Sequence, residues 1–220
     1  MRLLGKEIKF ILPEKGTLEP NGPGDPLWYY YKPFIGILYR KRIEHCLSLL
    51  EPKYGSILEV GYGSGILVPT LLNIADRVSG LDTVSDPERV KFNLGKIGIG
   101  ADLKRGDICC AEYPKESFDL IIAISILEHV EDINLLVRNV HRLLKPNGKF
   151  LVGMPNLKSF MNFGFFAIGY KSIEDYHVTS HRDFLKASSQ YFKLVKIRKM
   201  PGWAEESFSL YFSMLLSKEG

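Results

Sequence analysis

Three glycines at every second position follow an apolar run in "ILEVGYGSGILVPTLL", residues 57 to 72. Glu59 lies near the end of that run, and Gly61, Gly63 and Gly65 form the turn after it. Glycine lets the backbone turn sharply and lets a ligand approach the peptide groups closely. Free N–H groups at the start of a following helix favour an anionic group such as a carboxylate. The stretch therefore predicts a ligand-binding loop, with a merely tight strand-to-helix turn as the plain alternative.

An acid at the end of the next predicted strand adds a second ligand-binding group. Asp82 comes 17 positions after Gly65, where a carboxylate can accept both hydroxyls of a ribose. An acid at this place is also a common helix cap. The G-x-G-x-G spacing differs from the G-x-G-x-x-G of dinucleotide loops, which disfavours a nicotinamide oxidoreductase.

A third strand end offers what an adenine needs. The carboxylate of Asp107 suits the exocyclic amine, and Ile108 supplies an apolar wall and a backbone N–H. The alternative for Asp107 is turn chemistry after Gly106. Three consecutive strand ends, each suited to one part of a nucleoside ligand, indicate such a ligand more strongly than any one of them.

The elements that must position these residues alternate along the chain. Alternation of strands with helices predicts βαβ units and a parallel sheet, hence an α/β fold. Two further strand-like runs joined by a short connection predict an antiparallel hairpin with one reversed strand at the end of the sheet. The predicted strands are 56–60, 77–82, 101–107, 118–125, 149–155, 192–200 and 207–216, and the predicted helices are 36–50, 65–75, 85–97 and 132–145.

Composition limits the class of protein. A chain of 220 residues with a net charge of +4 fits one domain and lacks the Lys/Arg blocks of a nucleic-acid arm. We expect an irregular N-terminal segment or cap over 1–35 and one domain over 36–220. Three cysteines, with Cys109 and Cys110 adjacent at the expected end of a buried strand, favour a reducing cytoplasm. No metal-ligand spacing, secretory signal or transmembrane run is visible.

With these motifs in order, the sequence resembles the class I S-adenosylmethionine-dependent methyltransferases. "ILEVGYGSG" is similar to the first motif of that family, "ESFDLIIAISILEHVED" (116–132) to its fourth-strand motif, and "LLKPNGKFLVGMPN" (143–156) to the helix, turn and strand that follow. The resemblance implies a Rossmann-like, seven-stranded sheet with helices on both faces and S-adenosyl-L-methionine as cofactor. The implied cofactor-binding residues are Glu59, Gly61, Tyr62, Gly63, Gly65, Asp82, Thr83, Asp107, Ile108 and Ser125. Tyr62 departs from the usual Cys or Ala, and either packs on the cofactor or only lines the loop.

Methyl transfer requires alignment of a nucleophile behind an electrophilic methyl group, and a general base only when the acceptor arrives protonated. His129, just beyond the fourth strand, is a candidate base or orienting group, or else a helix-start histidine that bonds to backbone. His177 is a second candidate. It lies four positions before His181, and a cap or lid role is its alternative.

The acceptor is expected to bind outside these motifs. The aromatic segments 27–34 and 160–170 either form a substrate pocket and lid or pack the core. If these segments form a pocket and lid, the acceptor is a small molecule that is partly apolar or aromatic.

Two other functions are alternatives. An RNA or tRNA methyltransferase with a basic rim is disfavoured because the Asn/Asp-Pro-Pro-aromatic run is missing. The other alternative is a methyltransferase-like scaffold subunit without activity of its own. The sequence leaves the oligomeric state open.

Overall fold

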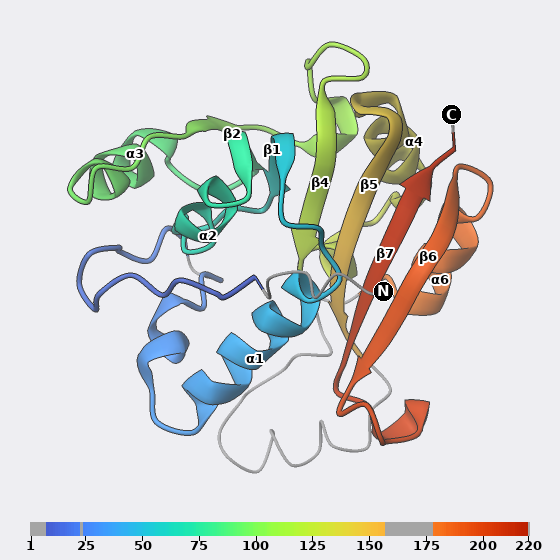
Figure 1. The fold of residues 1–220 in the computed structure, drawn as a ribbon, viewed down its shortest axis with the longest axis horizontal. Helices are drawn as coiled ribbons and strands as arrows, with labels where there is room; N and C mark the ends of the chain where they lie inside the picture. Colours follow the sequence, from blue (N-terminus) through green and yellow to red (C-terminus); the bar gives the residue numbers. More distant parts are fainter. Residues whose placement is uncertain (1–7, 23, 157–177, 220) are drawn as a thin grey trace, which may run out of the picture.

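A seven-stranded sheet in the order β3-β2-β1-β4-β5-β7-β6 runs through the protein in the computed structural model, which describes residues 8–22, 24–156 and 178–219 (Figure 1). β1 pairs in parallel with β2 and β4, and the parallel pairing continues to β3 on one side and β5 on the other. The strands are β1 (Tyr54–Val60), β2 (Ala75–Asp82), β3 (Asp102–Arg105), β4 (Phe118–Ile124), β5 (Leu144–Pro155), β6 (Phe192–Met200) and β7 (Tyr211–Lys218).

The C-terminal hairpin completes the sheet. β7 is antiparallel to both β5 and β6, so the predicted mostly parallel sheet with one reversed strand is confirmed. The reversed strand lies between β5 and β6, and β6 forms the edge of the sheet. Six residues of β6, from 193 to 198, are exposed, and three of them, Lys193, Lys196 and Arg198, carry a positive charge. Such charges discourage another chain from pairing with an open edge.

Helices cover both faces of the sheet, as the sequence predicts. One core lies between the sheet and the helices α1, α2 and α3, and the other lies between the sheet and α4 and α6. β4 shows why both faces must be covered, because Leu120 and Ile122 enter the first core while Ile121 enters the second. The helices are α1 (Ile35–Leu47), α2 (Val68–Leu72), α3 (Pro87–Gly95), α4 (Ile133–Leu143) and α6 (His181–Ser188), with short 3-10 turns η1 (Leu27–Tyr31), η2 (Ile108–Cys110), η3 (Leu127–His129) and η5 (Glu206–Phe208).

Three predicted elements are wrong in extent, and the first is β5, which begins at Leu144 and not at 149. The helix expected over 65–75 is only the five-residue α2: Pro69 lies in its first turn as expected, but Gly65 keeps a positive φ, and the chain already enters β2 at Ala75. The strand expected from 207 begins only at Tyr211, and Phe208 instead lies in η5 with 49% of its surface exposed.

The two adjacent cysteines also differ from expectation. Cys109 and Cys110 do not end a buried strand, because β3 stops at Arg105. They form the short turn η2, which the carboxylate of Asp107 caps by accepting the N–H of Cys109 at 2.8 Å. Cys110 is exposed, and all three cysteines are free thiols.

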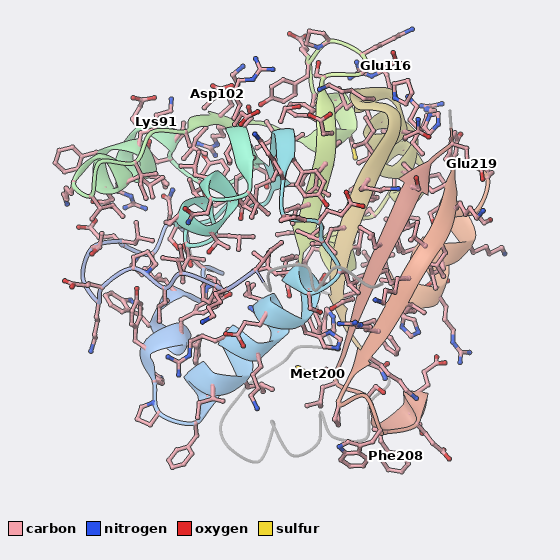
Figure 2. All side chains as sticks on the ribbon, in the orientation of Figure 1. Lys91, Asp102, Glu116, Met200, Phe208 and Glu219 are labelled. Carbon is pink, nitrogen blue, oxygen red and sulfur yellow. The ribbon has the colours of Figure 1, made fainter. Side chains whose placement is uncertain are left out.

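The parallel strands run from the end of the sheet marked by Glu116 toward the end marked by Met200 (Figure 2). α1 lies toward the Met200 end, where the parallel strands terminate (Figure 1). In open α/β sheets this is the end at which ligands bind. Within the described residues, no helix is sufficiently long and apolar to span a bilayer.

Candidate active site

The glycine loop after β1 has the backbone that its sequence predicts. Gly61, Gly63 and Gly65 have φ values of +75°, +53° and +78°, which L side chains rarely adopt. Gly61 donates its N–H to the carbonyl of Leu81 at 2.7 Å, which ties the loop to the end of β2. The side chain of Ile126 occupies the place where a Cβ on Gly61 would be. The loop is therefore pressed against the segment that follows β4.

Asp82, at the end of β2, holds the loop through its carboxylate. One oxygen accepts the N–H of Gly63 at 2.9 Å, and the other accepts those of Val84 and Ser85 at 2.8 and 2.9 Å. A carboxylate has about four lone-pair sites, so three bonds leave acceptor capacity for a hydroxyl group. Thr83, the next residue, is exposed, and its carbonyl accepts the Nε–H of Arg105.

A segment from the N-terminal region covers the same loop. The side-chain amide of Asn21 donates to the carbonyl of Gly63 at 3.4 Å, and Ser85 Oγ donates to the same carbonyl at 3.1 Å. The Asp25 carboxylate accepts the Ser64 hydroxyl at 3.4 Å and lies 3.4 Å from a Cβ built on Gly63. Burial raises the pKa of Asp25, despite hydrogen bonds that favour its charged form. No motif in the sequence marks Asn21 or Asp25.

Glu59 is the buried acid beneath the loop. Its side chain is 6% exposed, and its Oε2 has no hydrogen-bond partner among the described residues. Burial raises its pKa well above the usual range, and the negative charge of Asp82 adds to this. An orphaned carboxyl oxygen inside a protein is costly and marks a place where a ligand's donor would fit.

The side chain of Tyr62, within the loop, points into the core. It is 1% exposed and belongs to the core shared with α2 and α3, and a Cβ on Gly80 would lie 2.7 Å from its ring. Its hydroxyl has no partner within the described residues.

Asp107 and Ile108 stand at the end of β3. Asp107 is exposed and caps η2, the turn chemistry that the sequence left as an alternative, whereas the Ile108 side chain is buried in the core with α4. The amide of Asn139 holds the Ile108 carbonyl at 2.7 Å, which fixes this turn on α4.

The residues after β4 lie beside the glycine loop. Ser125 has a φ of +57°, and its hydroxyl is 2.8 Å from that of Tyr211. His129 is exposed in η3, with its backbone N–H bonded to the carbonyl of Ile126 at 3.0 Å. The second candidate, His177, lies outside the described residues. His181 stacks on Phe212 and bonds to Glu206 at 3.1 Å.

Glu128, the neighbour of the predicted candidate His129, is the buried acid of this segment. It is 2% exposed, and burial raises its pKa to about 8, partly offset by a bond to its own backbone N–H and by the charge of Arg42. Arg42, on α1, stacks on the ring of Tyr39 at 4.1 Å. No motif marks either residue, because their significance comes from burial and not from spacing.

The aromatic segment 27–34 divides between core and surface. Leu27 and Tyr30 are buried, while Trp28 and Phe34 are 46% and 85% exposed. Tyr39 of α1 stacks on Tyr29 and meets Tyr30 edge to face. Segment 160–170 lies outside the described residues. The described residues contain no group of three or more His, Cys, Asp or Glu side chains suited to a metal ion.

Comparison with known proteins agrees with this architecture. Residues 58–152 match a family described as "Methyltransferase domain". Over these residues the sequence is that of a methyltransferase domain, and the seven-stranded sheet is the fold that the resemblance to class I S-adenosylmethionine-dependent methyltransferases implied. The glycine loop directly follows the first strand, as the sequence predicts.

A "Ubiquinone biosynthesis O-methyltransferase" from Bartonella tribocorum is 25% identical over 162 residues, which cover 73% of this chain and 62% of the relative. The chain thus spans less than two thirds of that relative's length. A crystal structure of a Pyrococcus horikoshii protein aligns with a TM-score of 0.69 at 17% identity, covering 88% of this chain and 96% of the other. The N-methyltransferase NodS from Bradyrhizobium japonicum, in complex with S-adenosyl-L-homocysteine, aligns at 0.62 and 16% identity, with 90% and 94% coverage.

Proposed function

We propose that the protein transfers a methyl group from S-adenosyl-L-methionine to a small, partly apolar or aromatic acceptor. The observation that carries the proposal is the glycine loop, fixed by its hydrogen bond to Asp82, together with the buried, unpartnered oxygen of Glu59. An ammonium group is a donor suited to that oxygen, and ribose hydroxyls suit the remaining capacity of Asp82. The cofactor-binding residues named from the sequence keep these roles as part of the proposal.

When bound, the cofactor supplies a methyl group on a positively charged sulfur, which is already electrophilic. The protein then has to exclude water and align the acceptor, and alignment alone can contribute about 7 to 11 kcal/mol. The loop, Ile126 and the N-terminal residues Asn21 and Asp25 would enclose the cofactor from three sides. His129 and His177 remain candidates for orienting the acceptor.

The acceptor is inferred from chemistry and from the names of relatives. Trp28, in η1 next to α1, is 46% exposed and places aromatic surface toward the ligand-binding end of the sheet, whereas Tyr30 and Tyr39 beside it are buried. The name of the Bartonella relative supports a small-molecule acceptor and makes oxygen the first atom to test. We further propose that residues 36–220 form the methyltransferase domain with 1–35 as its cap, and that the protein works in the reducing cytoplasm, which suits its free thiols.

Calorimetric titration with S-adenosylmethionine and S-adenosylhomocysteine tests the proposal. We expect micromolar affinity for both, abolished by Asp82→Ala, and no binding of NADH. Methyl transfer to a panel of small phenols, amines and acids then assigns the acceptor. Absence of cofactor binding by the wild-type protein, or transfer only to strongly polar and charged acceptors, would contradict the proposal.

A further inference from the structure

Beyond the cofactor loop, two buried atoms of charged side chains lack hydrogen-bond partners within the described part of the chain. They are Nε of Arg42, from α1, and Oε2 of Glu128, from η3. Leaving such a group unsatisfied costs about 1–3 kcal/mol, and more when it is charged. These two residues are 86 positions apart in the sequence, so the fold alone brings them into one region.

The two side chains act on each other without forming an ion pair. The charge of Arg42 lowers the pKa of Glu128 against the larger effect of burial, yet no oxygen of Glu128 lies within 4.0 Å of a nitrogen of Arg42. Tyr211, from β7, also interacts electrostatically with both. A bound group that accepts from Nε of Arg42 and donates to Oε2 of Glu128 would satisfy both atoms.

The pair lies next to the site where the cofactor is proposed to bind. Ile126, two residues before Glu128, fills the space beside Gly61. On the other side, Arg42 is held in place because its guanidinium stacks on Tyr39 and Nη2 donates to the hydroxyl of Tyr30 at 3.4 Å. These contacts leave Nε as the free donor of the guanidinium edge.

Gly153 of β5 allows this arrangement. A Cβ there would lie 2.5 Å from the hydroxyl of Tyr211 and 2.7 Å from the sulfur of Cys46, so any larger residue would displace both. With glycine present, the Tyr211 hydroxyl reaches Ser125 at 2.8 Å. Gly153 of β5, Cys46 of α1 and Tyr211 of β7 therefore pack closely together, and Tyr211 is the member that acts electrostatically on both Arg42 and Glu128.

We propose that Arg42 and Glu128 hold the reacting hydroxyl group of the methyl acceptor, with Glu128 as the base that removes its proton and Arg42 as the donor that stabilises the resulting oxyanion. This inference rests on the proposed function and deepens it, because it commits the acceptor to an acidic hydroxyl such as a phenol or an enol. The acceptor O–H bond breaks and its proton passes to the Glu128 carboxylate. The oxygen lone pair forms the new C–O bond as the S–CH₃ bond breaks, and that electron pair remains on sulfur. Glu128 afterwards releases its proton to solvent.

The proposed role of Arg42, stabilisation of the acceptor oxyanion, can be tested with a coloured phenol and without methyl transfer. 4-Nitrophenol absorbs visible light only as its phenolate, so the spectrum of the bound probe reports its ionisation. With saturating S-adenosylhomocysteine at pH 6, we expect the wild-type protein to raise the phenolate-to-phenol ratio about tenfold. Arg42→Met should remove this effect, and Lys41→Met, an exposed cation on the same helix, should not.

The proposed role of Glu128, removal of the acceptor proton, is tested by the pH dependence of methyl transfer to phenols. The groups that act on Glu128 within the described residues are Arg42 and Tyr211. In the wild-type protein we expect kcat/KM to rise with pH and level off near the pKa of Glu128. Glu128→Gln should lower kcat by about 10²-fold or more and remove this rise, while Glu128→Asp retains part of both. Affinity for S-adenosylhomocysteine should stay within about twofold in all variants.

The outcomes separate this inference from the proposed function. If the wild-type protein binds S-adenosylhomocysteine but leaves bound 4-nitrophenol neutral, or if Glu128→Gln keeps the wild-type pH profile, the pair is not the acceptor site and the proposed function stands. If the wild-type protein binds no S-adenosylhomocysteine, the proposed function fails. The titration of 4-nitrophenol in its absence then still decides whether Arg42 binds an oxyanion.

Discussion

The carboxylate of Asp82 accepts the backbone N–H of Gly63 at 2.9 Å, so the acid at the end of β2 shapes the loop at the end of β1. The same carboxylate turns the chain after β2 through the N–H groups of Val84 and Ser85. One side chain thus connects the two strand ends at which the nucleoside and methionine parts of the cofactor are proposed to lie.

Replacing Asp82 with Asn should therefore damage both the loop and the cofactor site. An amide oxygen replaces one carboxylate oxygen and an NH₂ group the other, so at least one backbone N–H loses its acceptor. We expect affinity for S-adenosylhomocysteine to fall about tenfold or more and stability to fall by about 1–3 kcal/mol. Calorimetry and urea denaturation measure these. Asp102→Asn, an exposed acid at the start of β3, is the control. Equal affinities in Asp82→Asn and wild type would contradict the role of this carboxylate.

The contact between Gly61 and Ile126 can be separated from backbone strain. Gly61 and Gly98 have similar φ values of +75° and +72°, but the side chain of Ile126 fills the space beside Gly61, whereas nothing lies within 4 Å of a Cβ on Gly98. Both Gly→Ala variants carry the strain of a positive φ, about 1–2 kcal/mol. Gly61→Ala should cost at least about 1 kcal/mol more because Ile126 must move. If thermal unfolding finds the two variants equally stable, the side chain of Ile126 can move away from Gly61 without a measurable loss of stability.

The cover formed by the N-terminal segment predicts a cofactor effect from a residue outside every motif. Asp25 accepts the backbone N–H groups of Asn21 and Leu27, both at 2.9 Å, and thereby fixes the turn that lies on Gly63. Asp25→Ala should loosen this turn, lowering stability by about 1–2 kcal/mol and weakening S-adenosylhomocysteine binding several-fold. Glu19→Ala, an exposed acid nearby, should change neither quantity. A loss of stability without a change in affinity would restrict the segment to a structural role.

Asp119 predicts a pH dependence of stability at the other end of the sheet. Partial burial raises the pKa of its carboxyl, but hydrogen bonds from Lys145 and Ser56 outweigh this and bring it below the ordinary value of 3.8. Because the folded pKa is the lower one, the stabilisation is fully present above the ordinary value and is lost as pH falls through the folded value.

We therefore expect Asp119→Asn to be less stable than wild type at pH 7, by about 1–3 kcal/mol, and the difference to shrink as the pH is lowered below 4. Urea denaturation at a series of pH values measures it. A difference that stays constant from pH 7 down to pH 3 would mean that the charge of Asp119 contributes nothing to stability.

Much of the site could be predicted from the sequence because it depends on local rules. The glycine spacing requires positive φ values, and Gly61, Gly63 and Gly65 have them. Apolar runs ending in acids mark strand ends, and Asp82 ends β2 as expected. The lengths of the elements were less predictable. α2 ends at Leu72 because the chain then pairs with β1, where the N–H of Tyr54 bonds to the carbonyl of Ile74. This pairing is a tertiary contact, and helical periodicity carries no information about it.

The sequence by itself determined the class of fold, the order of the strands' motifs and the loop at which a cofactor is expected, because each depends on residue type and on spacing over a few positions. Only the tertiary structure decided that Asn21 and Asp25 cover Gly63, and that Arg42 and Glu128 share a buried region without touching. The physical reason is burial. Whether a charged side chain is solvated or enclosed depends on distant segments packed against it, and that packing sets both its pKa and its need for a partner.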